Sequence, residues 1–536
     1  MKKLRRFITT EVTVKGESFD KKEVVINENP FLHMMFKGLN LNIDEVERID
    51  WMVKVQFNNK EEALKLKDLP LTLGESRYYY YLSTPSDMKK NKGIYIREDV
   101  VEIVKQYESI VSCGWIDSLE GQVGVNVNKD VASRLSLFFS SSYLTSIKHN
   151  CLVLPEVQYK TIQSIRTFEN GEFVVKEDYD HYSVFADGCG IASPDLMRRV
   201  SKELQLGYQP CFIGVRSIKL ALKGLLVSID FIKYFEDMYE KNTDWIEKRE
   251  DGFYARDIWQ NWIKIDNNTI ITNISMCKWA SKISLEEYEA KRPEELADIM
   301  DALFITKISK KEPAKIKKTS YQLLCQLALN AEDYNEITKK TYDFLSGVLK
   351  GDRDCIYKFL GAISEASEDD EDEVSEEGED EDKELTDRLR YLLQIDFERF
   401  YKLPWVKRTL ANMVERSVKE LMSGKFFIEG DFKTIVNAPL GILNFVMNRK
   451  DVKEYPIQEI NDTLGSNEFW CKTKDKQVLS CRFPIASFSE VGVMDFVEDD
   501  LYKKYCGHWT KELCVFNAKD TRAKILSGAD KISLSA

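Results

Sequence analysis

The chain has 536 residues, of which 43% are hydrophobic and 11% aromatic, so it can bury large cores and should divide into several domains. Its eleven cysteines include no C-x-x-C pair and it has only four histidines, which indicates neither a zinc site nor a disulfide framework. The net charge of −12 does not exclude nucleic-acid binding: residues 365–384 hold fourteen acids and one base, and the remainder is nearly neutral.

The first 108 residues are expected to form a small β-rich domain. Short β-prone runs alternate with turns, for example at Glu11–Val14, Glu23–Ile26 and Trp51–Phe57. Tyr78–Leu82 is a further strand candidate, although aromatic rings beside Lys89 could instead stack on bases. No apolar run has the length of a signal peptide or a membrane span, so we expect a cytoplasmic protein without membrane association.

Residues 109–282 are expected to form a second β-rich region that contains one helix. Ser193 is a predicted N-cap, followed by a proline and an aspartate, and Leu196, Val200 and Leu204 recur at helical spacing. Two β-prone stretches follow, and Gly224 inside the second indicates a bulge or a close approach of two backbones.

The pattern becomes helical over residues 283–423, with leucines at helical spacing on both sides of the acidic run 365–384. This run is poor in apolar residues and repels itself, so we predict a disordered insert within a helical connector. A strand-like pattern resumes over residues 424–536. The order β, helical, β is typical of two similar β-domains joined by helices.

Four segments carry residue types suited to chemistry. Ala132–Ser142 is an apolar stretch that ends in three hydroxyls, and Asp187–Ser193 is a glycine-punctuated turn without the G-x-G-x-x-G pattern of dinucleotide binding. Phe212–Gly224 holds three cations in a strand setting: Arg216, Lys219 and Lys223. Such cations usually mark a solvated face, but a lysine beside a glycine offers charge where a phosphate can approach. The fourth segment joins Arg482-Phe483-Pro484 to the later Ser527–Asp530.

In this order the segments resemble the core of the RNA-silencing type RNA-dependent RNA polymerases and of the YonO-like phage RNA polymerases. Ala132–Ser142 is similar to their A-R-h-G-h-x-F-S-S stretch, and Asp187-Gly188-Cys189-Gly190-Ile191-Ala192-Ser193 looks like their D-G-x-G-x-I-S motif. Arg216 with Lys223-Gly224 looks like the Q-I-R…K-G strand pair. Arg482-Phe483-Pro484 looks like R-x-P, and Ser527-Gly528-Ala529-Asp530 looks like the start of the S-G-x-D-x-D-G-D loop.

The resemblance implies a fold and a set of roles. The fold would be a multidomain α+β chain with two double-psi β-barrels, at 109–282 and 424–536, the second incomplete, joined by the connector 283–423. The activity would be template-directed transfer of nucleoside monophosphates from nucleoside triphosphates to an RNA 3′ end. Asp530 would bind Mg²⁺, Lys223 would contact substrate phosphates or the primer end, and Arg482 would bind the ribose of the nucleotide. Arg216 and Lys219 would assist substrate binding, with Arg216 better placed to support the first barrel.

One departure from the family pattern weighs against activity. The family's loop continues from its first aspartate through x-D-G-D, whereas Asp530 is followed by Lys531-Ile532-Ser533-Leu534-Ser535-Ala536. One carboxylate cannot build a site for two magnesium ions. We therefore expect the chain alone to be inactive, as a fragment or as one half of a split polymerase whose loop is completed by a separate chain.

Two other functions stay open, and so does the template. The chain could be a non-catalytic remnant that still binds nucleic acid, or an interaction protein whose acidic run recruits basic partners. For a polymerase, silencing-type relatives copy RNA while phage relatives transcribe DNA, and the high Lys, Asn and Ile content favours the phage-like branch. Lys223 and Arg482 should face a common cleft, because both would serve one nucleotide.

Overall fold

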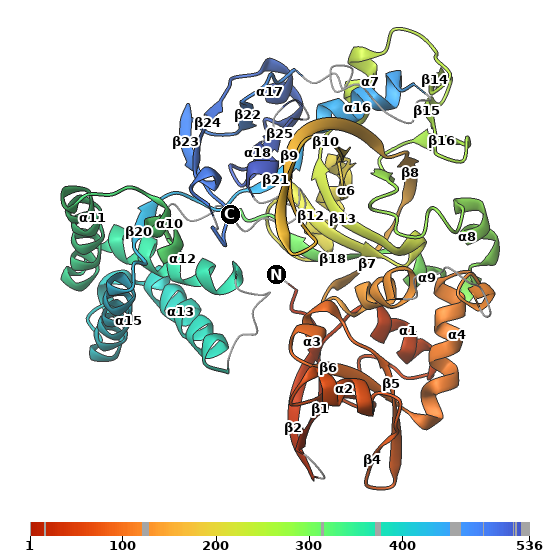
Figure 1. The fold of residues 1–536 in the computed structure, drawn as a ribbon, viewed down its shortest axis with the longest axis horizontal. Coiled ribbons are helices and arrows are strands. Elements are labelled where there is room, and N and C mark those ends of the chain that lie inside the picture. The colour runs from red at the N-terminus through yellow and green to blue at the C-terminus, as the bar shows by residue number, and fades with distance from the viewer. Residues whose placement is uncertain are drawn as a thin grey trace. The chain divides into compact units, whose positions relative to one another are not determined.

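The computed structural model describes residues 2–15, 18–119, 128–311, 316–369, 377–450, 463–485, 487–517, 519 and 522–526 (Figure 1). The chain forms two compact units, each assembled from separate stretches. Unit 1 contains residues 1–309, 437–463 and 501–508, and unit 2 contains 310–436, 464–500 and 509–536. Several sheets and many helices confirm the predicted multidomain α+β class. The predicted four-domain division stays a prediction.

Unit 1 begins with a six-stranded sheet in the order β2-β1-β3-β6-β5-β4. Strands β1 and β3 are parallel and the other neighbours are antiparallel. The β-prone runs of the first hundred residues lie in these strands, and four helices accompany them. The elements are β1 (Arg6–Lys15), β2 (Ser18–Asn27), α1 (Pro30–Gly38), β3 (Arg48–Gln56), α2 (Lys60–Leu66), β4 (Leu71–Leu73), β5 (Ser76–Leu82), α3 (Pro85–Lys89), β6 (Lys92–Arg97) and α4 (Val101–Val111).

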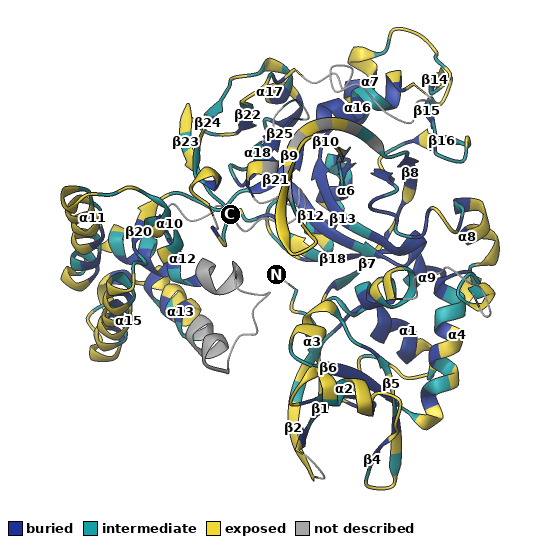
Figure 2. Cartoon of the chain, in the orientation of Figure 1, coloured by how far each residue is buried: buried dark blue, intermediate teal, exposed yellow. Residues whose placement is uncertain are grey.

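A mixed seven-stranded sheet, in the order β7-β18-β12-β13-β11-β17-β8, is the centre of unit 1. Its edge strands β7 and β8 are consecutive in the chain and are separated by His149 alone, so the sheet curls until its two edges meet at that residue. Strands β12 and β13 are buried over nearly their whole length (Figure 2). The strands are β7 (Tyr143–Lys148), β8 (Asn150–Leu154), β11 (Cys189–Ala192), β12 (Phe212–Ser217), β13 (Leu222–Ser228), β17 (Thr269–Asn273) and β18 (Ala302–Ile308).

The predicted helix after Ser193 is confirmed as α6. The Ser193 hydroxyl accepts a hydrogen bond from the Leu196 amide at 3.1 Å, and Leu196, Val200 and Leu204 are fully buried. A two-stranded and a three-stranded sheet complete unit 1 together with further helices. These elements are α5 (Ser133–Leu135), β9 (Val157–Glu169), β10 (Glu172–Phe185), α6 (Pro194–Glu203), α7 (Phe231–Met238), β14 (Ile246–Arg249), β15 (Gly252–Arg256), β16 (Trp262–Ile265), α8 (Leu285–Lys291), α9 (Ala297–Met300), α16 (Pro439–Asn448) and α17 (Asp500–Cys506).

Unit 2 combines a helical part with a five-stranded sheet in the order β21-β25-β22-β24-β23. A separate pair, β19 and β20, runs antiparallel beside the helices. The elements are β19 (Ile316–Lys318), α10 (Tyr321–Gln326), α11 (Ala331–Lys350), α12 (Arg353–Asp369), α13 (Glu377–Ile395), α14 (Phe397–Phe400), α15 (Pro404–Met422), β20 (Phe427–Glu429), β21 (Thr434–Asn437), β22 (Glu468–Cys471), β23 (Gln477–Ser480), β24 (Gly492–Phe496), β25 (Leu513–Phe516) and α18 (Arg522–Ile525).

The acidic run 365–384 includes the end of α12 and the start of α13. Helix α12 continues to Asp369 and α13 begins at Glu377, and residues 370–376 lie outside the described part of the chain. The predicted disorder of the run stays a prediction. Among the described helices, none has the length and apolar character needed to cross a membrane.

Candidate active site

The second and third sequence segments meet on adjacent strands at the centre of the seven-stranded sheet. Strand β11 pairs with β13 in parallel, with Cys189 opposite Leu225. Strand β12 pairs with β13 antiparallel, and Arg216 lies directly opposite Lys223. The strand pair implied by the family resemblance is therefore present, and its two cations are register partners.

Glycines allow these strands to approach closely. A Cβ atom on Gly224 would lie 2.7 Å from the Gly188 carbonyl oxygen and 2.5 Å from Met276 Cε, and one on Gly190 would lie 2.6 Å from the Ile271 carbonyl oxygen. Real Cβ atoms do not come so near to other atoms. The close backbone approach predicted at Gly224 is confirmed, and the D-G-x-G segment provides the opposing backbone.

Lys223 is half-buried beside this approach. Its backbone amide donates to the Met276 carbonyl at 2.9 Å, and the next residue is the tightly packed Gly224. Asp187 immediately precedes Gly188, whose carbonyl contacts Gly224. Asp187 therefore lies in the turn before β11, and Lys223 lies near the start of β13, the strand whose Leu225 amide donates to Gly188.

Glu156 was not singled out by the sequence patterns. Burial, and then the nearby charge of Asp187, raise the pKa of Glu156, while Lys278 acts in the opposite direction. The two carboxylates are therefore close enough to interact. Asp187 opens a recognisable motif, but Glu156 and Lys278 belong to no motif, so only the folded chain reveals this cluster.

The Arg216 side chain is held by burial and by a hydrogen bond to the backbone. Its Nη1 donates to the Val215 carbonyl at 2.9 Å, its Nε atom is buried without a hydrogen-bond partner, and burial lowers the pKa of the guanidinium to about 10. A charged group in such surroundings is costly unless a further anion or polar group reaches it.

Lys219 is more deeply buried than lysines in proteins usually are. It lies in the 3₁₀ turn Lys219–Ala221 between β12 and β13 and is only 4% exposed. Its ammonium lies 3.4 Å from a carboxylate oxygen of Glu289 and 5.6 Å from the ring centre of Tyr288. These contacts give Lys219 a structural role, and its predicted part in substrate binding stays a prediction.

Arg482 lies in unit 2, just after β23. Its Nη1 donates to the Leu526 carbonyl at 3.5 Å, so it contacts the residue that directly precedes Ser527. The following Phe483–Pro484 peptide bond is cis, and the Ile485 amide donates to the Gln322 side chain on α10 at 2.9 Å. The R-x-P segment is thus tied both to the helical part of unit 2 and to the start of the predicted loop.

Asp530 lies outside the described residues, together with Ser527, Gly528 and Ala529. Within the described ranges, no group of three His, Cys, Asp or Glu side chains could hold a metal ion. The predicted Mg²⁺ site at Asp530 stays a prediction. Lys223 belongs to unit 1 and Arg482 to unit 2. That they face one cleft stays a prediction.

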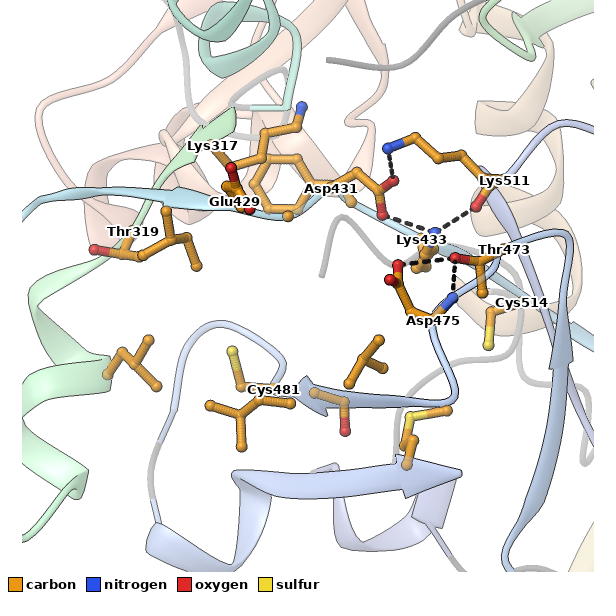
Figure 3. Close-up of a pocket in the computed structure, with 18 of the residues that line it drawn as sticks. Lys317, Thr319, Glu429, Asp431, Lys433, Thr473, Asp475, Cys481, Lys511 and Cys514 are labelled. Atoms are coloured by element: carbon orange, nitrogen blue, oxygen red, sulfur yellow. Dashed lines mark hydrogen bonds and ion pairs between the residues drawn. The ribbon is translucent and has the colours of Figure 1, made fainter. Parts of the chain in front are cut away.

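Unit 2 contains a groove of about 620 Å³ (Figure 3). Phe483 of the R-x-P segment and Leu526 both line it. Its polar end holds Asp431, which pairs with Lys433 at 2.8 Å and with Lys511 at 2.6 Å. The Lys433 ammonium also donates to the Lys511 carbonyl. The two lysines share the Asp431 carboxylate, and the groove is also lined by the charged residues Lys317, Lys318, Lys358, Glu429 and Asp475.

The fold is similar to that of a solved RNA-dependent RNA polymerase. The solved structure of "RNA dependent RNA polymerase QDE-1 from Thielavia terrestris" matches with a TM-score of 0.55 and 14% sequence identity, covering 99% of this chain and 53% of that one. This chain thus spans about half the length of that polymerase, and the likeness concerns the fold.

The family follows from the sequence. A family model described as RNA dependent RNA polymerase matches residues 10–530, nearly the whole chain. The chain therefore belongs to the RNA-dependent RNA polymerase family, which confirms the silencing-type resemblance. No curated protein matches the sequence.

Proposed function

We propose that this chain acts in template-directed RNA synthesis, transferring nucleoside monophosphates from nucleoside triphosphates to an RNA 3′ end. The observation that carries the proposal is the family match, which spans both the Gly188–Gly224 contact and the Arg482–Leu526 contact. An RNA template is favoured by the family. A DNA template, as in the YonO-like phage polymerases, is the alternative, and the cytoplasm is the proposed location.

The proposed fold and roles follow the motif geometry. The curled seven-stranded sheet would be the first double-psi β-barrel and the five-stranded sheet the second. Lys223, set beside a close backbone approach, would offset the charge of the triphosphate or hold the primer end. Arg482 would bind the ribose of the same nucleotide. Arg216, which is bonded within β12, would position the strand that carries Lys223. Lys219, which contacts Glu289 and Tyr288 of helix α8, would support the turn between β12 and β13.

Asp530 would hold Mg²⁺ in this proposal, and the ion would neutralise phosphate charge when bound. The other residues of the family's x-D-G-D are not present at the positions that follow: Ile532 and Leu534 stand where aspartates are expected, and Ser533 where glycine is expected. This observation favours a second candidate, a nucleic-acid-binding protein that is inactive alone or is completed by a separate chain carrying the loop.

Restoring the loop within this chain separates a polymerase from a protein that only binds nucleic acid. Template-dependent RNA synthesis by the restored chain would support the polymerase, and tight Mn²⁺ binding without synthesis would support the binding protein. We expect the unaltered chain, given nucleoside triphosphates, Mg²⁺ and an RNA or DNA template, to make no RNA. The triple variant Ile532→Asp, Ser533→Gly, Leu534→Asp completes the D-x-D-G-D pattern and should bind Mn²⁺, followed by electron paramagnetic resonance, at least about tenfold more tightly, because added carboxylates raise cation affinity.

The matched control adds Asp530→Ala to the triple variant and should abolish the gain in Mn²⁺ binding and any template-dependent synthesis. Synthesis by the unaltered chain would show that other carboxylates form the metal site. Equal Mn²⁺ affinity in the triple variant and in its Asp530→Ala derivative would remove Asp530 from the proposal.

A further inference from the structure

The three strands β14, β15 and β16 form a small antiparallel sheet in unit 1 that buries one of its faces (Figure 1). Successive side chains of a strand point to opposite faces. The inner face includes apolar side chains that are at most 5% exposed, namely Ile246, Phe253, Ala255 and Ile265. The Phe253 ring lies 6.0 Å from that of Phe235 on α7. The opposite, outer face of the sheet is therefore turned away from the core.

Cations and aromatic rings gather on this outer face. Alternation assigns to it the side chains of Glu247, Arg249, Tyr254, Arg256, Trp262 and Lys264. The register agrees, because Arg256 lies opposite Trp262 and Tyr254 lies opposite Lys264. Residues 246–265 hold four bases, Lys248, Arg249, Arg256 and Lys264, and four acids, Glu247, Glu250, Asp251 and Asp257. The strand positions of the outer face receive three of these bases and one of the acids, so alternation makes the face basic although the composition is balanced.

Four planar groups of the outer face form a continuous row. The Arg249 guanidinium carbon lies 4.0 Å from the centre of the Tyr254 ring and 5.5 Å from that of the Trp262 ring. The Arg256 guanidinium carbon lies 4.7 Å from the centre of the Trp262 ring. Cation–π contacts of this kind hold the groups against one another. The members of this planar row are half-buried or exposed, so the row is part of the protein surface.

The planar row ends in a positive charge that no described acid neutralises. Glu247 pairs with Arg249 at 3.1 Å, and Asp251 pairs with Lys264 at 2.7 Å. Arg256 forms no ion pair with any residue in the part of the chain that the structure describes, and its Nε atom is buried without a hydrogen-bond partner. Three cations against their two partner carboxylates leave this surface with a charge of +1, on a chain whose net charge is −12. Arginine is suited to bind phosphate as the missing anion.

We propose that the outer face of β14, β15 and β16 binds single-stranded nucleic acid, with bases stacked on the planar row and a backbone phosphate at Arg256. Aromatic rings and guanidinium planes stack on bases of any sequence, and arginine contacts the phosphates. A duplex keeps its bases paired, and an acidic protein would use the charge of this face but not its rings. The inference deepens the proposed function, on which it rests for the choice of RNA as the strand.

Fluorescence anisotropy with a labelled oligouridine tests the proposal in the full chain, without nucleoside triphosphates or Mg²⁺. Trp262→Ala removes a ring of the planar row and should weaken binding about tenfold, as the loss of one stacked base does. Trp262→Phe keeps a ring and should stay within about threefold of the original affinity. Trp405→Ala is the matched control, because Trp405 is a surface tryptophan of α15, 48% exposed and outside the row, and it should leave the affinity unchanged.

Salt dependence separates stacking from charge. Arg256→Gln should reduce the slope of log affinity against log salt concentration by about 0.7, the share of one phosphate contact on a single strand. Trp262→Ala should leave that slope unchanged, because a stacked base releases no counterion. Arg198→Gln is the control for charge: Arg198 lies on α6 and is 60% exposed, and its replacement should change neither the slope nor the affinity.

Several results would overturn the proposal. They are an unchanged affinity in Trp262→Ala, equal losses in Trp262→Ala and Trp405→Ala, or a salt slope that Arg256→Gln does not reduce. Duplex RNA that binds as tightly as oligouridine would also overturn it, because paired bases cannot stack on the planar row. A polyglutamate peptide whose binding is weakened by Arg256→Gln as much as that of RNA would replace the nucleic acid by an acidic protein.

An oligothymidine of the same length distinguishes RNA from DNA as the strand. Binding of both supports a surface for single strands, and the strand bound more tightly is the one that the surface serves. Because nucleoside triphosphates and Mg²⁺ are absent, these affinities do not depend on RNA synthesis. A chain that synthesises RNA but shows no effect of Trp262→Ala on binding would overturn this inference alone, and a chain that binds as expected but never synthesises RNA would overturn the proposed function alone.

Discussion

Replacing Gly224 by alanine tests the close packing beneath Lys223. The new Cβ would lie 2.7 Å from the Gly188 carbonyl oxygen and 2.5 Å from Met276 Cε. Neither neighbour can move freely, because Met276 is fully buried and the Gly188 carbonyl accepts a hydrogen bond from the Leu225 amide at 3.0 Å. Overpacking of this kind costs about 1–3 kcal/mol. We expect a loss of unit 1 stability in that range.

The assay follows unit 1 by itself. Amide exchange of the β13 residues Leu225 and Val227, measured under native conditions, reports the free energy of opening that strand. Gly430→Ala is the control, because the nearest atom to its new Cβ is 4.0 Å away, and exchange in β13 should then stay within about 0.5 kcal/mol of the original. If Gly224→Ala behaved like this control, the close approach of β13 and the Gly188 turn would be refuted.

Three further changes have defined outcomes. Lys219→Met should leave the thermal midpoint of unfolding nearly unchanged, because an apolar side chain of similar length replaces the lysine that pairs with Glu289. Lys219→Ala should lower the midpoint, because it removes the buried aliphatic part of the side chain. Glu156→Gln should raise the thermal midpoint of unfolding at pH 8 but not at pH 4. The pKa of Glu156 is raised on folding, so the folded protein loses stability when this carboxyl ionises at higher pH, and glutamine cannot ionise. Replacing residues 365–384 by a short Gly-Ser turn should shift the midpoint by less than about 2 °C; the joined ends are close, with Ser364 Oγ 3.4 Å from Asp387 Oδ1, and a large drop would show that the run packs.

Local chemistry made much of the fold predictable. The Ser193 cap, the proline after it and the helical spacing of Leu196 and Val200 specify α6 without help from the rest of the chain. Gly224 was informative for a similar reason, since a glycine in an otherwise apolar strand has few explanations besides a bulge or a close approach.

Long-range pairing was not predictable from pattern. The meeting of the sheet edges at His149 and the electrostatic interaction of Glu156 with Asp187 depend on which segments become neighbours, and periodicity carries no such information. The burial of Lys219 goes against the general preference of lysine for solvent, because its turn joins two strands that are buried over nearly their whole length. The contact of Arg482 with Leu526 joins segments that are distant in sequence.

Affinity labelling tests the central claim, that Lys223 and Arg482 serve one nucleotide in a polymerase site. Adenosine diphosphopyridoxal, which keeps the ribose intact and carries an aldehyde at the phosphate end, reacts with lysines beside the bound phosphates, and borohydride reduction fixes the product for mass spectrometry. We expect labelling of Lys223, suppressed by excess unmodified ATP and reduced at least about tenfold, equal to about 1.4 kcal/mol of binding, by Arg482→Ala. Labelling spread over other lysines, or labelling of Lys223 that neither ATP nor Arg482→Ala reduces, would contradict the claim.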